Sequence, residues 1–216
     1  MSKNVNRIRS RLGRILSSIF RKEKIFVFEH ALTNLCFEAK TKVKVDVSLI
    51  KSNDFSEVAR ARALSEIVKT FKDYRKKANE RFKAGHICFG AKLNGEYVHL
   101  KWIAFNESYV DEIHRKIRIS SDSAYLFNSY TIPNYRGLGI SSKVMEKTIQ
   151  HLSKMGIKKV YALVSHNNFP MLRVKQKERA RKIGTITYTK IFKLRLYKFK
   201  SETAEDYKKL TEMFSI

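Results

Sequence analysis

The sequence predicts a mixed α/β fold, and three observations support this prediction. A strand, a helix and a second strand follow one another at residues 123–132, 140–155 and 158–165, which is the pattern of a parallel βαβ unit. Alternating apolar residues surround Asn94 and Gly95, and this dipeptide between two such runs is a strong signal for an antiparallel hairpin. Only 2 prolines and 8 glycines occur in 216 residues, so we expect mostly packed structure and little linker.

The N-terminal region combines a basic amphipathic segment with two strands. Apolar residues recur every three or four positions from residue 5 to residue 22, and arginines and lysines fill most positions between them, which predicts a helix. We assign residues 1–24 to this helix, which packs on its own domain, docks on a partner or lies in an anionic membrane interface. IFVFEH at residues 25–30 is the first predicted strand, and KVKVDVSLI at residues 42–50 alternates as a half-exposed strand does.

The middle of the chain contains helices, the hairpin and an irregular stretch. Residues 52–82 carry apolar side chains at helical spacing after several capping residues, which predicts one or two helices. The hairpin around Asn94 follows. Residues 105–122 are polar and less regular, so no strand or helix is assigned there. The apolar run at residues 123–132 then predicts a buried strand.

The C-terminal third continues the alternation of helices and strands. A helix at residues 140–155 stops at Gly156, and the apolar residues 158–165 predict a covered strand. A basic helix is expected at about residues 170–182. GTITYTKIFKLRLYKF, which follows it, predicts one long strand or a bent pair.

Length and composition favour one domain with two appendages. We expect a single domain at residues 25–200, preceded by the basic helix and followed by a C-terminal helical tail at residues 201–216. The net charge of +25 predicts attraction to an acidic partner: nucleic acid, an anionic lipid surface or a phosphate-rich small molecule. Cys36 and Cys88 lack the spacing of a metal site or disulfide framework, and no apolar run approaches the roughly 20 residues of a membrane span. We therefore expect a cytoplasmic protein, with peripheral attachment to the membrane surface as an alternative.

The segment TIPNYRGLGISS at residues 131–142 links the buried strand to the following helix. A helix that opens directly after a glycine turn leaves its first backbone amides unpaired, and these donors attract phosphate. Gly137 and Gly139 permit positive φ and close approach of a ligand, and Arg136 can add a charge-assisted contact. The turn is therefore a candidate pyrophosphate site, although a tight strand-to-helix connection alone also explains the two glycines.

With its flanking strand and helix, IPNYRGLGISSKVMEKTIQHL resembles the central motif of the GNAT superfamily of acyl-CoA-dependent N-acetyltransferases. Residues 136–141 fit that motif except that Ser141 stands where the family has glycine or alanine. The resemblance implies an α/β fold with a mixed, mostly antiparallel twisted sheet, a central parallel strand pair that splays, and helices on both faces. It also implies the following acyl-CoA-binding residues: Tyr130, Ile132, Arg136, Gly137, Leu138, Gly139, Ile140, Ser141 and Asn168.

The resemblance continues in VYALVSHNNFPMLRVKQKERARKIGTI with several departures. Asn168 and Lys177 match the family's asparagine and lysine, whereas Met171, Arg179 and Ala180 replace other motif residues. Lys175 stands where the family often has the tyrosine that protonates the departing CoA thiolate. Lys175 is expected to be solvated, with CoA phosphate binding as the alternative, and the general acid stays unassigned.

The resemblance implies an acyltransferase that transfers groups other than aminoacyl groups, with acetyl-CoA or another acyl-CoA as co-substrate and no metal. The expected reaction is direct attack of a primary amine on the thioester, with the amine proton removed by a carboxylate or histidine. Glu107, Glu112 and His166 are the main candidates for this base. Further candidates are the following: His99, Asp111 and His114.

Two other functions remain open from the sequence. The charge excess and the cationic cluster at residues 173–182 are typical of a nucleic-acid-binding protein without catalysis. Alternatively, the basic surface and the amphipathic segment suit a long-chain acyltransferase that takes its acyl group from acyl carrier protein. The acceptor amine and the oligomeric state do not follow from the sequence.

Overall fold

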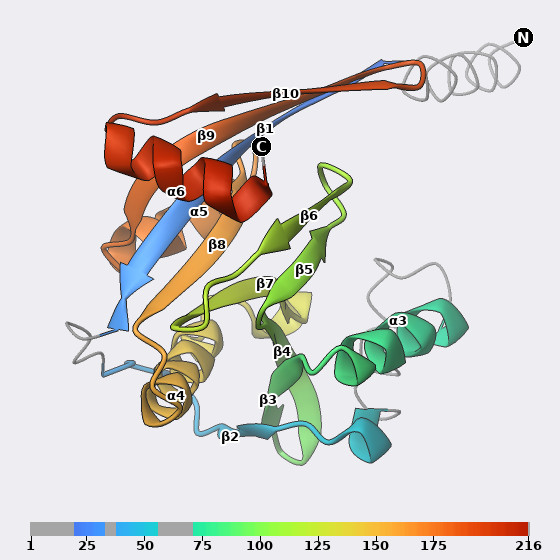
Figure 1. Ribbon diagram of the computed structural model, residues 1–216. Helices are drawn as coiled ribbons and strands as arrows, with labels where there is room; N and C mark the ends of the chain where they lie inside the picture. Colours follow the sequence, from blue (N-terminus) through green and yellow to red (C-terminus); the bar gives the residue numbers. More distant parts are fainter. Residues whose placement is uncertain (1–19, 33–37, 56–70, 216) are drawn as a thin grey trace, which may run out of the picture. The chain divides into compact units, whose positions relative to one another are not determined.

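The computed structural model describes residues 20–32, 38–55 and 71–215 (Figure 1). The chain divides into two compact units. Unit 1 comprises Met1–Glu29, Tyr109–Ile117 and Leu163–Ile216, and unit 2 comprises His30–Ser108 and Arg118–Ala162. Residues 1–19, 33–37 and 56–70 lie outside the described part, and with them most of the predicted N-terminal helix and the middle of the helical segment 52–82.

Unit 2 contains the strand–helix–strand series that the sequence predicts. Its strands follow the order β8-β7-β4-β3-β2, and every neighbouring pair in this series is antiparallel except the parallel pair β7–β8. The bounds are β2 Asp46–Leu49, β3 Ile87–Leu93, β4 Glu96–Ala104, β7 Ser123–Thr131 and β8 Lys159–Ser165. The parallel ladder covers Ser123–Leu126 with Lys159–Ala162, whereas β7 continues to Thr131. The predicted mixed, mostly antiparallel sheet with a central parallel pair is therefore confirmed.

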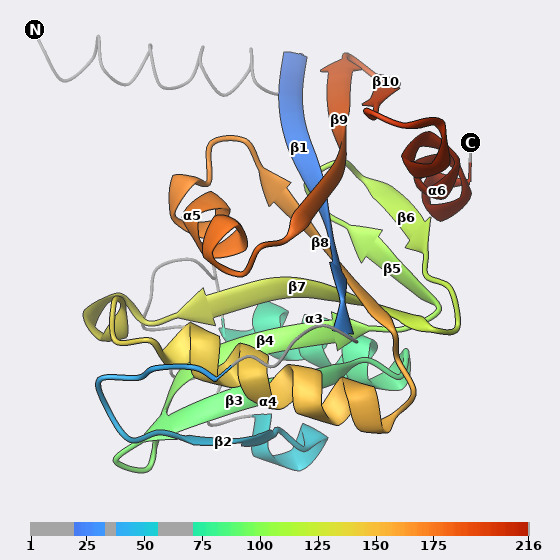
Figure 2. The same ribbon diagram turned by 90° about the vertical axis from the view of Figure 1, so that its left-hand side faces the viewer.

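Helices lie on both faces of the unit 2 sheet. Figure 2 shows α4 (Ile140–Lys154) on one face and α3 (Phe71–Lys83) on the other. Beneath α4, aliphatic side chains such as Val144, Ile149 and Leu152 pack against residues of β3, β4 and β7. The α3 face is aromatic, with Phe55, Tyr74, Phe82, Trp102 and Phe127 packed together. The burial of large apolar side chains on both faces makes this sheet the core of the unit.

An irregularity in β7 changes which of its residues share a face. Leu100 pairs with Tyr130 while Trp102 pairs with Phe127, so two β7 residues stand opposite Lys101. Asn128, one of the two, has φ +48°, a conformation that asparagine tolerates better than most residues. Tyr130 therefore returns to the aromatic face with Phe127. In a regular strand Asn128 and Tyr130 would share one face, and the irregularity separates them.

Two hairpins lie between residues 87 and 118, and the sequence predicted one of them. Asn94 and Gly95 turn β3 into β4 with φ +52° and φ +85°, the two positive values that their residue types favour. The irregular region 105–122 instead contains a second hairpin, β5 Glu107–Val110 with β6 Arg115–Arg118. Its strands are only four residues long and are interrupted by charged side chains, so their alternation was too short to indicate strands.

Unit 1 joins strands from the two ends of the sequence. β1 (Phe20–Ala31) pairs antiparallel with β9 (Arg181–Ile191), and β10 (Leu194–Lys200) pairs antiparallel with the other side of β9. The strand begins at Phe20, so the assignment of residues 20–24 to a helix is wrong. These residues form a strand because β9 supplies a hydrogen-bonding partner for each of them from far along the chain.

The helices of unit 1 lie on opposite sides of β9 (Figures 1 and 2). α5 spans Phe169–Lys177 and is shorter than the predicted helix, because Arg181 and Lys182 already belong to β9. α6 spans Ala204–Phe214 and occupies the segment predicted as a C-terminal helical tail. Across the part of the chain that the structure describes, no helix is both long and apolar enough to cross a membrane.

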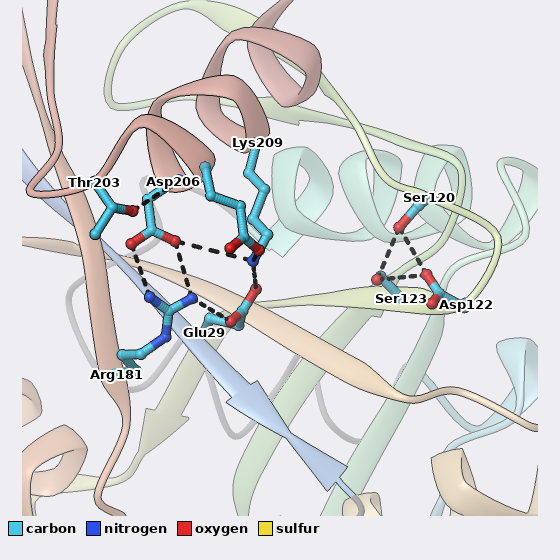
Figure 3. A network of polar contacts seen from close by, with 9 residues as sticks. Glu29, Ser120, Asp122, Ser123, Arg181, Thr203, Asp206 and Lys209 are labelled. Atoms are coloured by element: carbon cyan, nitrogen blue, oxygen red, sulfur yellow. Dashed lines mark hydrogen bonds and ion pairs between the residues drawn. The ribbon is translucent and has the colours of Figure 1, made fainter.

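A partly buried ion network connects α6 to the strands of unit 1 (Figure 3). The Arg181 guanidinium donates to both carboxylate oxygens of Asp206 at 2.7 and 2.9 Å and to Glu29 at 2.7 Å. Lys209 adds an ion pair with Glu29 at 3.7 Å. Hydrogen bonds from Arg181 hold the pKa of the Asp206 carboxyl below its ordinary value despite burial. Figure 3 also shows Asp122 of unit 2, which accepts hydrogen bonds from two serine hydroxyls.

Candidate functional site

The turn after β7 leads directly into α4. The 3-10 helix Pro133–Tyr135 is followed by Gly137 with φ +78° and Gly139 with φ +81°. Lys143 donates its amide to the Gly139 carbonyl, so the amides of residues 140–142 precede the first bond of the helix. Gly139 is the N-cap residue and offers no side chain to cap them. These donors and the positive end of the helix dipole are groups that attract an anion, which agrees with the predicted pyrophosphate site without testing it.

The two glycines of the turn have different surroundings. A Cβ on Gly137 would meet nothing within 4 Å, so this side of the turn is open. A Cβ on Gly139 would overlap the carbonyl oxygen of Lys40 and lie 3.0 Å from Cα of Thr41. Gly139 therefore permits the close approach of the chain's own backbone, and only Gly137 leaves room for a ligand.

Hydrogen bonds hold the segment before β2 against the turn. The Lys42 amide donates to the Leu138 carbonyl at 3.0 Å, and the Ala39 amide donates to the Glu146 carboxylate at 2.8 Å. Lys143 also donates to Glu146 at 2.8 Å. Burial raises the pKa of Glu146, but the bonds from Lys143 and the Ala39 amide outweigh it and leave the pKa lowered. Glu146 therefore stays ionised and links the segment to α4.

The last residues of β7 are partly bonded to β4. The Ile132 amide donates to the Val98 carbonyl at 3.0 Å, and the Ile132 carbonyl accepts from the Tyr135 amide at 3.0 Å. This bond makes Thr131 and His99 a non-hydrogen-bonded pair, so the amide and carbonyl of Thr131 point away from β4. By the same alternation the backbone of Tyr130 faces β4. The backbone groups of Tyr130 and Ile132 therefore face β4, and the binding of acyl-CoA by these two residues stays a prediction.

Arg136 is held beside the turn by two contacts. Its Nε donates to the Thr131 carbonyl at 3.1 Å, and its guanidinium lies 5.7 Å from the centroid of the Tyr130 ring. The carbonyl uses one of the five N–H donors of the guanidinium. The exposed Arg136 side chain therefore keeps donors and a full charge next to the open side of Gly137.

His99, one of the candidate bases, is buried, and its ring contacts two hydroxyl groups. Its Nδ1 lies 2.7 Å from Thr131 Oγ1, and its Nε2 lies 3.4 Å from Ser129 Oγ. Only 3% of the residue is exposed. Both ring nitrogens are therefore used to hold the end of β7, and His99 is better suited to positioning Thr131 than to accepting a proton from substrate.

His86 is a candidate base that the sequence did not indicate. Its ring packs edge-on against Phe127 with 5.9 Å between centroids, and Phe127 is the first β7 residue beyond the ladder with β8. Burial and the charge of Arg81 hold the pKa of His86 below its ordinary value, although Glu107 opposes them. The ring is therefore neutral near pH 7. In sequence His86 merely precedes a strand, which gives no sign of these neighbours.

The other candidate bases that the sequence indicated lie in unit 1, except Glu107, which lies at the exposed start of β5 in unit 2. Asp111 and Glu112 are exposed in the β5–β6 turn, where His114 has φ +50°. His166 Nδ1 lies 3.2 Å from the Lys24 carbonyl oxygen, which can only accept, so this nitrogen is the donor. Each of these residues has a local structural role or an exposed position, and the structure gives no assignment of the base among them.

Two motif residues on α5 have structural partners. Asn168 caps the helix by accepting from the Met171 amide at 3.2 Å. Lys175, expected to be solvated, is 5% exposed and forms a buried ion pair with Glu178 at 2.7 Å. The expectation for Lys175 is therefore wrong, since the pairing with Glu178 makes burial of its charge possible.

Comparison with known proteins identifies the family. A family model described as the acetyltransferase (GNAT) family matches residues 54–191, more than half of the chain. The chain belongs to the GNAT family. Comparison with curated protein sequences gives no significant match. Acyl transfer is thus the general chemistry that the family supports for this GNAT chain.

Solved structures share the fold at low identity. A GNAT acetyltransferase from Colwellia psychrerythraea has a TM-score of 0.57 at 12% identity, with 85% of this chain and 57% of that chain covered. A conserved protein of unknown function from Staphylococcus epidermidis has a TM-score of 0.55 at 13% identity, with 82% and 64% covered. AAC(6')-Iy, solved with a bisubstrate analogue containing CoA, has a TM-score of 0.50 at 15% identity, with 62% and 88% covered. The chain therefore spans less than two thirds of the first two proteins.

Proposed function

We propose that this GNAT protein is an N-acetyltransferase that moves an acetyl group from acetyl-CoA to a primary amine by direct attack on the thioester. The observation that carries the proposal is the turn at residues 136–142. It combines an open side at Gly137, the first amides of α4 and the guanidinium of Arg136. These groups suit the diphosphate of coenzyme A, and family membership makes an acyl-CoA the expected acyl donor.

The backbone of β7 would orient the acyl-bearing arm. Thr131 turns its amide away from β4, at a point where the ladder with β8 has already ended. An amide of the arm would pair with it as an added strand does. His99 and Ser129 would keep Thr131 in place, since the His99 ring lies between their hydroxyls. Holding the thioester and the amine together would supply most of the rate enhancement.

The transfer itself requires a neutral amine and an acceptor for its proton. The amine nitrogen forms a bond to the thioester carbonyl carbon, the C–S bond breaks, and the thiolate takes up a proton as it leaves. His86 is our candidate for removing the amine proton, directly or through a water, because its lowered pKa keeps the ring neutral beside Phe127. Glu107 influences the same ring and is the second candidate.

A titration with CoA and acetyl-CoA tests the proposal, with Gly137→Ala as the variant and Gly156→Ala as its control. Both glycines have φ +78°, and a Cβ on either meets nothing within 4 Å, so the backbone strain is matched. We expect a loss of CoA affinity of about tenfold or more in Gly137→Ala only, since a methyl group would obstruct the anion. Equal affinities in the two variants, or no CoA binding by the native protein, would contradict it.

A screen of amines then defines the acceptor and the acyl group. Release of free thiol is followed with acetyl-CoA, longer acyl-CoAs and acyl carrier protein as donors, and with amino acids, amino sugars, polyamines and aminoglycosides as acceptors. Thiol release that depends on acceptor supports N-acetylation. Activity confined to long acyl groups would favour the long-chain alternative.

The nucleic-acid alternative loses part of its basis. Of the cationic residues at 173–182, Lys175 is buried in its pair with Glu178, and Arg181 is bound to Asp206 and Glu29. These two charges are neutralised by the protein itself. The sequence cluster therefore does not form one continuous cationic helix face.

A further inference from the structure

The free end of the three strands in unit 1 carries an exposed apolar row. Phe20, Ile191 and Leu194 are direct cross-strand neighbours on β1, β9 and β10, and their exposed fractions are 52%, 39% and 58%. Phe192 in the β9–β10 turn is 66% exposed, and Leu196 is 48% exposed. Figure 1 shows the three strands side by side up to this end. We call residues 20–22 and 189–196 the strand tip.

The next row of the strand tip is entirely cationic. Arg21, Lys190 and Arg195 stand directly opposite one another on the three strands. Glu23 pairs with Arg21 at 3.2 Å, and within the described residues Lys190 and Arg195 have no acidic partner. Three like charges in register oppose folding of the sheet. Their field also contributes, after burial, to the lowered pKa of His114. An external anion would relieve this repulsion.

The order of the two rows fits the surface of a lipid bilayer. Successive rows of a sheet are about 3.3 Å apart, so the apolar row lies just beyond the cationic row towards the tip. In an interface, apolar side chains enter the acyl boundary while lysine and arginine stay at the phosphates. No aspartate or glutamate occurs between Glu178 and Glu202, so β9 and β10 bring no negative charge to the tip.

We propose that the strand tip docks onto an anionic lipid bilayer, with Phe20, Ile191, Phe192 and Leu194 inserted and the cationic row bound to headgroup phosphates. Residues 5–19 directly precede Phe20, and their basic amphipathic sequence favours the same surface. The proposed catalytic function is independent of this docking. Docking would place an acetyltransferase beside membrane-associated acceptors.

Other occupants fit the strand tip less well. Pairing of two copies through the edge strand β10 would bring Arg195, Lys198 and Lys200 against the same cations of the second copy. Nucleic acid would neutralise the cationic row but would leave Phe192 and Leu194 without an apolar environment. The bilayer accounts for both rows together.

Flotation of the full chain with vesicles tests the docking. Vesicles of phosphatidylcholine alone are compared with vesicles containing phosphatidylglycerol, at low and high salt. We expect binding to anionic vesicles that weakens with salt, and a loss of roughly 30-fold for Lys190→Gln with Arg195→Gln. Phe192→Ser with Leu194→Ser should lose roughly tenfold or more. Control pairs are Lys154→Gln with Lys208→Gln, and Met155→Ser with Tyr207→Ser, which should bind as the native protein does.

A second readout does not depend on the loss of affinity. Trp102 is the only tryptophan and is fully buried, so it gives a constant fluorescence background. In Phe192→Trp, the added indole should shift to the blue on anionic vesicles and be quenched by brominated acyl chains. The docking is refuted if vesicle binding is absent, if both tip variants bind as the native protein does, or if the indole stays in water. Two further outcomes, each in the absence of vesicle binding by the native protein, would also overturn it. One is a dimer that is lost in Phe192→Ser with Leu194→Ser, and the other is DNA binding that is lost only in Lys190→Gln with Arg195→Gln.

Discussion

The substitution Gly139→Ala separates the two roles of the glycine turn. Gly137 and Gly139 both have positive φ, so an alanine at either position adds about 1 kcal/mol of backbone strain. At Gly137 this strain is the whole effect on the free energy of unfolding, because the added Cβ meets open space. At Gly139 the Cβ overlaps the Lys40 carbonyl, so the segment before β2 has to move.

The displacement at Gly139 would weaken two hydrogen bonds of that segment. One joins Lys42 to the Leu138 carbonyl at 3.0 Å, and the other joins the Ala39 amide to Glu146 at 2.8 Å. A neutral bond contributes about 1 kcal/mol and a bond to a carboxylate about 2 kcal/mol. We therefore expect Gly139→Ala to lower the free energy of unfolding by about 3 to 4 kcal/mol, or roughly 10 °C in Tm for a chain of this size.

Urea denaturation and CoA titration of the same three proteins measure this difference. Gly137→Ala and Gly156→Ala should each lose about 1 kcal/mol of stability, and only Gly137→Ala should lose CoA affinity at full folding. Gly139→Ala should lose stability first and bind CoA only as far as it remains folded. A Gly139→Ala variant as stable as Gly137→Ala would refute the inference that Gly139 serves the contact with Lys40.

Two further predictions concern titrating groups. Burial and the charge of Arg81 hold the pKa of His86 in the folded chain below its ordinary 6.5. As pH drops below 6.5, the unfolded chain binds this proton more readily than the folded chain, so the free energy of unfolding falls. If His86 is the base, the acid limb of kcat/KM lies below pH 6.5 and is lost or displaced in His86→Asn; an unchanged pH profile with normal folding would exclude it. Arg181→Gln removes the bonds of the guanidinium to the buried carboxylates of Glu29 and Asp206, although Lys209 still pairs with both. It should lower the free energy of unfolding by roughly 2 kcal/mol at pH 7, after allowance for the half-exposed guanidinium. The native contribution of Asp206 should vanish as pH falls below 3.8 through its lowered pKa, and acid denaturation that is identical in Arg181→Gln would contradict this.

Local features of the fold followed from the sequence. The Asn94–Gly95 hairpin depends on two residues that tolerate positive φ, and the glycine turn depends on its own strand and helix. The βαβ unit was also visible because its hydrophobic periods change from two to 3.6 within one segment. Each of these signals lies within one continuous stretch of the sequence.

Features that depend on distant partners did not follow. Phe20–Lys24 is a strand because β9 lies beside it, and the partner of Gly139 is Lys40, almost one hundred residues earlier. The irregularity at Asn128 reverses the faces of β7 without any glycine or proline to signal it. His86 acquires its lowered pKa only from the neighbours that the fold brings to it. Such properties belong to tertiary contacts rather than to local pattern.

Amide chemical shifts of the labelled full chain, recorded by NMR while CoA is added, test the phosphate cradle most directly. We predict saturable shifts at the amides of residues 137–142 and at Thr131, with the turn amides moving most because they donate to the diphosphate. Saturable CoA binding that leaves these amides unmoved, or no binding at millimolar CoA, would contradict the assignment of the turn.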